Sequence, residues 1–140
     1  MSPRFVLDTS AILALFHDEP GADRVEGIIR DAARQACHVA IAGVSLLEVY
    51  YRVYRLKGEE AALEHYLWLR QLPLEVRSDL SERWLLESGR MKARHPMSLA
   101  DAQIAALAVL LDATLVHKDP EFEPLTDIRQ EALPLKPKKG

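Results

Sequence analysis

The sequence predicts an α/β fold, in which a central, mostly parallel sheet is flanked on both sides by helices (α/β/α). Short apolar runs alternate along the chain with longer segments of helical periodicity, which is the pattern of β–α units and a parallel sheet. The chain has 140 residues, of which 49% are hydrophobic, so it can form one globular domain with its own core. We expect that domain to cover residues 1–135, with a frayed tail over residues 136–140.

The N-terminal segment predicts one strand followed by two helices. A short apolar strand at Arg4–Leu7 stops at Asp8, and Ser10–Phe16 has helical character. A Pro-Gly pair then breaks the chain before a helix of about Ala22–Gln35, whose apolar residues recur at helical spacing.

The middle of the chain predicts a second strand and a helical hairpin. The run HVAIA at His38–Ala42 suits a buried strand. A helix at Ser45–Lys57 ends at Gly58, and a second helix at Glu59–Leu72 follows closely. The hairpin is rich in tyrosine and leucine and contains Trp68.

The next segment predicts a short strand and a capped helix. Leu74–Val76 is the strand, and Ser78 or Asp79 caps a helix that runs to about Arg94 and ends at a His-Pro pair.

The last segment predicts a helix and two strands. Ser98 caps a helix at Leu99–Leu111, and Thr114–His117 is the following strand. Residues 120–131 have a mixed pattern, and Ala132–Leu135 is the predicted edge strand.

The composition argues against several classes of protein. A formal net charge of −3 argues against a non-specific DNA-coating protein, but not against a nuclease whose acids hold a metal ion. The longest apolar run, Ile104–Leu111, is far shorter than the ~20 residues that cross a bilayer. Asp8 interrupts the first apolar stretch, so we expect no signal peptide, and the single cysteine, Cys37, fits a reducing cytoplasm.

Four acidic residues lie near the predicted carboxyl ends of the strands. Asp8 directly follows the first strand, and Asp119 comes just after Thr114–His117. Glu48 and Asp101 each fall in the first turn of a helix near the same edge. Parallel sheets bind ligands outside the carboxyl ends of their strands, and hard oxygen ligands suit Mg²⁺ or Mn²⁺. We therefore predict that these four acids form a catalytic, metal-binding cluster.

Each acid also has a purely structural interpretation. The patterns SLLE and SLAD, which end in Glu48 and Asp101, both match a helix capping box. Asp8 suits the N-cap of the helix after it, and Asp119 precedes a proline, as acids in turns do. Capping and metal binding are compatible, because a capping carboxylate keeps one free oxygen. The joint placement of the four favours the metal site.

Four segments of the chain resemble a known family. VLDTSAIL, SLLEV, SLADAQIAALA and LVHKDPEF, which contain the four acids, resemble the PIN domain, especially the VapC-type toxins of bacterial and archaeal toxin–antitoxin pairs. The resemblance runs from about Arg4 to Leu135. It implies a single PIN-like domain and an endoribonuclease that depends on Mg²⁺ or Mn²⁺.

The resemblance also carries over to single positions. The four acids fall on the acidic positions of the family, and Thr9 and Ser10 fall on the small hydroxyl positions beside the first acid. One position departs from the pattern: the family often has a small hydroxyl residue two positions before the fourth acid, where this sequence has His117. Glu121 is therefore an alternative to Asp119 as the fourth acid.

RNA is the expected substrate. Arg94 immediately precedes the segment that leads to Asp101, and Lys118 adjoins Asp119, so we predict that both hold phosphates, together with Thr9 and Ser10. Arg94 equally suits the C-terminus of a helix, where basic side chains are favourable.

Two protein partners are expected. The hairpin at Ser45–Leu72 has more tyrosine, leucine and tryptophan than one small core needs, which predicts a homodimer and a partner surface. The resemblance implies an antitoxin, whose tail reaches the acidic pocket and sometimes places an arginine there.

Two rival functions remain open at this point. A PIN-like scaffold without catalysis would bind RNA or protein only, and divalent-ion binding distinguishes it from a nuclease. A phosphatase of the haloacid dehalogenase type would use Asp8 as phosphoryl acceptor, but it requires a second Asp where this sequence has Ser10.

Overall fold

The computed structural model describes residues 2–135 and contains one five-stranded sheet in the order β3-β2-β1-β4-β5. The strands are β1 (Arg4–Leu7), β2 (His38–Ala42), β3 (Glu75–Arg77), β4 (Thr114–His117) and β5 (Arg129–Ala132). Every pairing among these strands is parallel, which confirms the predicted sheet. The predicted frayed tail at residues 136–140 lies outside the described residues.

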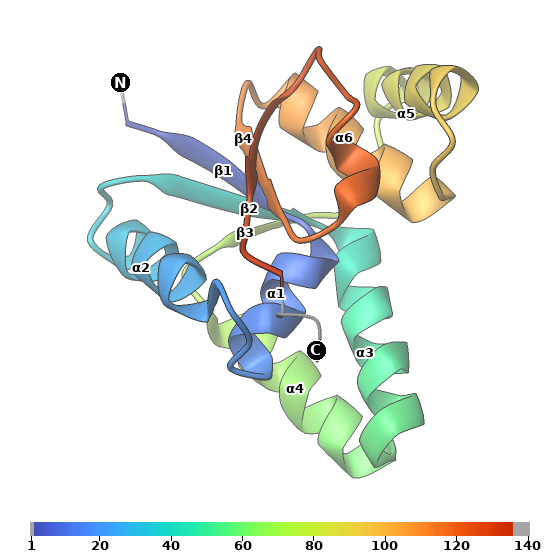
Figure 1. Cartoon of the computed structure of the whole chain (residues 1–140). Coiled ribbons are helices and arrows are strands. Elements are labelled where there is room, and N and C mark those ends of the chain that lie inside the picture. Colours follow the sequence, from blue (N-terminus) through green and yellow to red (C-terminus); the bar gives the residue numbers. More distant parts are fainter. Residues whose placement is uncertain (1, 136–140) are drawn as a thin grey trace, which may run out of the picture.

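Helices cover both faces of this sheet. They are α1 (Thr9–Phe16), α2 (Ala22–Ala33), α3 (Gly43–Lys57), α4 (Glu59–Gln71), α5 (Glu82–Arg94), α6 (Leu99–Leu110) and the one-turn 3-10 helix η1 (Pro120–Phe122). The core divides accordingly, with α1 to α4 packed on one face and α5 and α6 on the other, so the α/β/α architecture is confirmed (Figure 1). Within residues 2–135, no helix has the length and apolar character needed to cross a membrane.

Successive residues of the central strands supply the two halves of the core. On β1, Val6 packs with α6 and Leu7 packs with α1 and α2; on β4, Leu115 and Val116 divide in the same way. Side chains of a strand point alternately to opposite faces, so an unbroken apolar run is what a strand covered on both sides requires.

The carboxyl ends of β1 and β4 lie side by side, and this placement brings Asp8, the first acid, to the same edge as Asp119, the fourth. Leu7 is in register with Val116, and the Asp8 N–H donates to Val116 O at 2.9 Å. β1 has β2 on one side and β4 on the other, so the chain order of the strands reverses at this point. Open α/β sheets bind ligands in the crevice at such a switch point.

The start of α3 differs from the prediction. The helix begins at Gly43 rather than Ser45, and its N-cap, Ala42, makes no side-chain cap. Ser45 is therefore inside the helix, and Glu48 falls in the second turn instead of the first, so the predicted capping box at these two residues is wrong. The buried Ser45 hydroxyl instead lies 3.0 Å from the hydroxyl of Thr9. The predicted end of this helix at Gly58, whose φ is +92°, is confirmed.

The caps of α5 and α6 are side-chain caps. Ser98 Oγ accepts the Asp101 N–H at 3.1 Å, as predicted. Ser81, rather than Ser78 or Asp79, caps α5 through a 3.2 Å hydrogen bond from the Trp84 N–H.

The edge strand lies earlier in the chain than the predicted Ala132–Leu135. β5 spans Arg129–Ala132, and its last paired residue, Ala132, is in register with His117. The Leu133 N–H still donates to His117 O at 2.7 Å, but Pro134 has no N–H with which to continue the ladder. Polar residues that pair with β4 thus form the strand, and the more apolar residues after them do not.

Candidate metal centre

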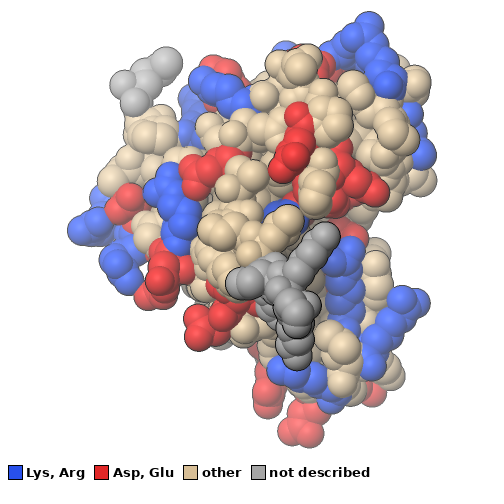
Figure 2. All heavy atoms as spheres, viewed as in Figure 1, with Lys and Arg blue, Asp and Glu red and all other residues tan. Residues whose placement is uncertain are grey.

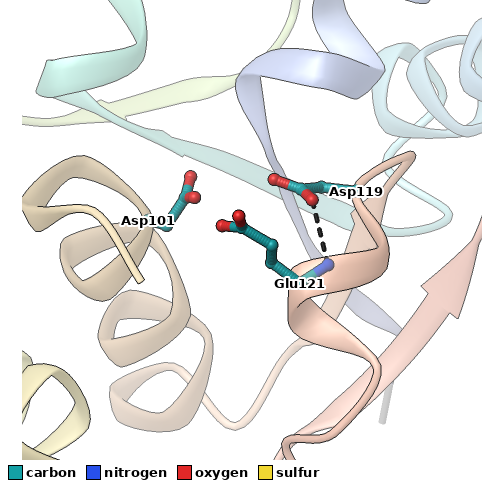
Figure 3. Close-up of side chains that lie close together, drawn as sticks. All are labelled: Asp101, Asp119 and Glu121. Carbon is teal, nitrogen blue, oxygen red and sulfur yellow. Dashed lines mark hydrogen bonds between the residues drawn. The ribbon is translucent and has the colours of Figure 1, made fainter. Parts of the chain in front are cut away.

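Three carboxylates from two segments converge beside the carboxyl end of β4. Asp101 comes from the first turn of α6, Asp119 from the loop after β4, and Glu121 from η1. One carboxylate oxygen of each lies within 4.8 Å of those of the other two. The three side chains point toward one another in Figure 3. Two of the predicted acids therefore meet, and they are joined by Glu121, which the sequence presents as the alternative to Asp119.

Side-chain acceptors fix three backbone amides of this loop. Ser10 Oγ accepts the Lys118 N–H at 2.9 Å, and His117 Nδ1 accepts the Asp119 N–H at 3.1 Å. Asp119 Oδ1 in turn accepts the Glu121 N–H at 3.0 Å, the bond drawn in Figure 3. Because these amides are satisfied within the protein, the loop is held in the conformation that turns both acids toward α6.

The other acids act on Asp101 electrostatically. Burial is the largest cause that raises the pKa of Asp101 to about 7, and the negative charges of Asp8, Asp119 and Glu48 raise it further. The four predicted acids therefore share one electrostatic environment. Asp8 and Glu48 nevertheless lie outside the trio whose oxygens fall within 4.8 Å of one another.

Asp8 has one oxygen engaged and one without a donor. Its side chain is buried, and Oδ2 accepts both the Ser10 N–H, at 3.0 Å, and the Ser10 hydroxyl. The N-cap interpretation of Asp8 is thus confirmed for this oxygen. Oδ1 is also buried, but no described residue gives it a hydrogen bond. Burial raises the pKa of Asp8 to about 6, although the hydrogen bonds from Ser10 lower it.

Glu48 is held by the protein on both oxygens. The Thr9 hydroxyl donates to Oε1 at 2.7 Å, and Arg52 Nη2 donates to Oε2 at 3.2 Å. The side chain of Glu48 is therefore oriented by one neighbouring hydroxyl and neutralised by a cation one helical turn further along α3. In this respect it differs from Asp8, whose side-chain hydrogen bonds within residues 2–135 come from the neutral Ser10.

These residues fit a small divalent cation. A buried carboxylate oxygen without a donor is costly, and the negative charges of clustered carboxylates repel one another, so both Asp8 Oδ1 and the trio are suited to a positive charge. Hard carboxylate oxygens are the ligands that Mg²⁺ and Mn²⁺ prefer.

The predicted RNA-contacting residues lie in three different settings. Arg94 is exposed in the last turn of α5, and no ion pair of its guanidinium is found within residues 2–135. Lys118 Nζ donates to Pro20 O at 2.9 Å from a side chain that is 8% exposed, which gives it a structural role between β4 and the α1–α2 connection. Thr9 and Ser10 hold carboxylates, as described above, so the RNA contacts of all four stay predictions.

Sequence reasoning missed Arg52. It stands four residues after Glu48, a spacing at which opposite charges pair on a helix. The next basic residue on α3, Arg55, lies over the ring of Tyr51 at 5.0 Å from its centroid. Lys and Arg side chains gather over α3 beside the patch of Asp and Glu side chains in Figure 2. The i,i+4 spacing was the available signal for Arg52.

Two ribonucleases of known family are similar to nearly the whole chain. Ribonuclease VapC30 of Mycobacterium tuberculosis is 29% identical over 136 residues, which are 92% of this chain and 99% of that protein. Ribonuclease VapC of Mycolicibacterium smegmatis is 28% identical over 129 residues, covering 88% and 96% of the two chains.

Solved structures share the fold. VapBC2 from Rickettsia felis, bound to a promoter DNA fragment, matches with a TM-score of 0.73 at 20% identity and covers 94% of this chain and 99% of that one. DNA-bound VapBC from Salmonella typhimurium matches with a TM-score of 0.72 at 21% identity and covers 93% and 98%. The family model of the PIN domain matches residues 5–127, a span that includes all four predicted acids and Glu121, and the chain therefore belongs to the PIN-domain family.

Proposed function

We propose that this protein is an endoribonuclease that hydrolyses RNA phosphodiester bonds with Mg²⁺ or Mn²⁺, and that it is the toxin of a toxin–antitoxin pair. The observation that carries the proposal is the convergence of the carboxylates of Asp101, Asp119 and Glu121. The charge of the buried Asp8 acts on the same cluster, because it raises the pKa of Asp101. The names of relatives that align over nearly the whole chain, which are ribonucleases of the VapC type, support RNA as the substrate.

We assign Asp8, Asp101 and Asp119 to the divalent ion, with Glu121 beside them. When bound, such an ion activates a water molecule and stabilises the charge that builds on phosphorus. Glu48 completes the set of acids. Because Thr9 and Arg52 fix both of its oxygens and Arg52 compensates its charge, Glu48 is suited to orient the attacking water.

Two arginines are suited to the RNA backbone. Arg52 already lies at the acidic cluster, with its guanidinium 3.2 Å from Glu48, and its side chain is 44% exposed. Arg94 is exposed at the end of α5, just before the loop that leads to the Ser98 cap of α6. A planar guanidinium recognises phosphate oxygens in pairs. We assign both side chains to phosphates on either side of the scissile bond.

The partners that fit are an antitoxin and a second copy of the chain, in the cytoplasm. The helical hairpin has a pocket of about 410 Å³ lined by apolar side chains, among them Leu47, Tyr50 and Leu63. Leu47 at this pocket is 61% exposed, and Trp68, which packs on Phe16 of α1, is 46% exposed on α4. The similar solved structures from Rickettsia felis and Salmonella typhimurium are of VapBC, which supports an antitoxin as one occupant of this surface.

An RNA cleavage assay tests this proposal. The purified chain is incubated with total transfer and ribosomal RNA, first with EDTA and then with increasing Mn²⁺ or Mg²⁺, and the products are resolved on a denaturing gel. Discrete fragments that form only with metal are expected. RNA that stays intact across the titration with folded protein would contradict the proposal, and RNA bound but uncut would instead support an inactive PIN-like binding module.

A further inference from the structure

His117 connects the loop of the fourth acid to the edge strand β5. Its side chain has no solvent exposure, and its ring packs on Phe122 with the two centroids 5.0 Å apart. Nδ1 accepts the Asp119 N–H at 3.1 Å, and Nε2 lies 2.8 Å from Gln130 Oε1. A residue of β5 thus reaches the acidic loop through a single imidazole ring.

Gln130 determines which ring nitrogen carries the hydrogen. Its amide nitrogen donates to two backbone carbonyls, Phe122 O at 3.0 Å and Leu125 O at 2.8 Å, so the amide oxygen must face the imidazole. An amide oxygen only accepts hydrogen bonds. His117 therefore carries its hydrogen on Nε2, and the lone pair of Nδ1 is left to receive the Asp119 N–H.

We propose that His117 is a positioning residue of the metal centre, which holds the Asp119 amide so that the carboxylates of Asp119 and Glu121 are set for a divalent ion. Asp119 Oδ1 accepts the Glu121 N–H, so the position of Asp119 also determines where η1 begins. The inference rests on the proposed function, because it concerns the same acids. It also accounts for the departure from the family pattern at position 117. The imidazole there supplies the hydrogen-bond acceptor that a small hydroxyl residue would otherwise supply.

Packing alone is the alternative role of a buried histidine, and two substitutions separate the two roles. Asparagine at position 117 places a polar atom near the location of Nδ1, whereas glutamine places one near Nε2. His117→Asn therefore keeps an acceptor for Asp119 but leaves the larger void beside Phe122. His117→Gln keeps the contact with Gln130 and more of the volume, but loses the acceptor. If His117 serves packing alone, His117→Gln should bind the metal better than His117→Asn. If His117 positions Asp119, His117→Gln should bind the metal more weakly than His117→Asn.

The experiment measures Mn²⁺ binding by titration calorimetry and unfolding by thermal melts, for the wild-type chain and both variants. We expect His117→Gln to bind Mn²⁺ about tenfold more weakly than wild type, as loss of a partner behind a metal ligand typically does. We expect His117→Asn to bind nearly as tightly as wild type, although its melting temperature is the lower of the two. Equal Mn²⁺ affinities of the two variants, or tighter binding by His117→Gln, would overturn the inference.

Two NMR measurements on the metal-free protein test the geometry without any metal. The imidazole ¹⁵N signals of His117 should show the hydrogen on Nε2, and the Asp119 amide should exchange slowly in wild type and His117→Asn but faster in His117→Gln. Hydrogen on Nδ1 would overturn the inference. Wild-type protein that binds Mn²⁺ with the expected order of variants but cuts no RNA would contradict the proposed function and leave this inference standing.

Discussion

Ser10 and Lys118 are 108 residues apart, yet the Ser10 hydroxyl joins the first acid to the loop of the fourth by accepting the Lys118 N–H at 2.9 Å. The same hydroxyl donates its hydrogen to Asp8 Oδ2. One small side chain thus links the carboxyl ends of β1 and β4 on the side where the acids converge. The small hydroxyl beside the first acid has a physical role, which is to hold the two strand ends at a fixed spacing.

Removal of this hydroxyl tests that role. Ser10→Ala leaves the Lys118 N–H without its acceptor and Asp8 without one donor, and we expect a loss of about 1–3 kcal/mol in the free energy of unfolding together with weaker Mn²⁺ binding. Urea denaturation and calorimetry measure the two effects. Ser81→Ala is the matched control, because Ser81 also accepts a backbone N–H but only caps α5. Mn²⁺ affinity that is unchanged in Ser10→Ala would contradict the role.

The metal-free protein should lose stability as the pH rises. Asp8 and Asp101 have pKa values raised from 3.8 to about 6 and about 7, so between pH 4 and pH 7 the folded state binds protons that the unfolded chain has released. Their contribution to stability is complete below pH 4, falls as the pH rises to about 7, and is absent above it. Urea denaturation in EDTA at a series of pH values measures this.

Two comparisons isolate the acids from other titrating groups. Asp8→Asn should reduce the fall in stability with pH, because the amide does not titrate. Saturating Mn²⁺ at pH 7.5 should raise the melting temperature of the wild type, because an ion that binds only the folded state stabilises it by about 2.7 kcal/mol at 100 times its Kd. A wild-type pH profile in EDTA identical to that of Asp8→Asn would show that Asp8 does not have the raised pKa.

The Thr9–Glu48 hydrogen bond should contribute to stability. Thr9→Val keeps the shape of the side chain but removes the donor to the buried Glu48 Oε1, and we expect a loss of about 1–3 kcal/mol in urea denaturation. Ser45→Ala removes only the neighbour of the Thr9 hydroxyl and should cost less. A larger loss in Ser45→Ala than in Thr9→Val would indicate that Glu48 is not held by Thr9.

Arg52 should matter to RNA more than its neighbour Arg55. Arg52→Gln removes the cation beside Glu48, and we expect kcat/KM for RNA to fall about tenfold, since hydrogen bonds to charged groups contribute about 1.5–3 kcal/mol. Arg55→Gln, one turn along α3 and stacked on Tyr51, serves as the control and should have a smaller effect. Steady-state cleavage rates at fixed salt measure both. Equal effects of the two changes would remove the special role of Arg52.

The fold and the approximate place of the site could be predicted from the sequence, because both depend on local patterns. Alternating short apolar runs and helices determine a parallel sheet, and an acid directly after a strand, such as Asp8 or Asp119, must lie at its carboxyl edge. Ser98 was predictable as a cap because its bond to the Asp101 N–H is local.

Features that depend on contacts distant in sequence could not be predicted. The predicted start of α3 was wrong because the Ser45 hydroxyl contacts Thr9 instead of capping the helix. The predicted bounds of β5 were wrong because the strand consists of the residues that pair in register with β4, and these are not the most apolar residues of the segment. The Lys118 side chain donates to Pro20 O, 98 residues away in the chain, and this contact leaves no periodic signal in the sequence.

The metal centre is tested by the RNA cleavage of two variants, Asp8→Asn and Asp101→Asn. They are made separately and assayed with Mn²⁺, beside melting curves for both variants and wild type. Asparagine has nearly the size of aspartate and caps a helix as well, so the fold should survive, but a neutral amide is a poor ligand for a divalent ion. We predict that each variant is folded and cuts no RNA, because each has lost a carboxylate that the metal centre requires. Full cleavage by either folded variant would contradict the metal centre described here.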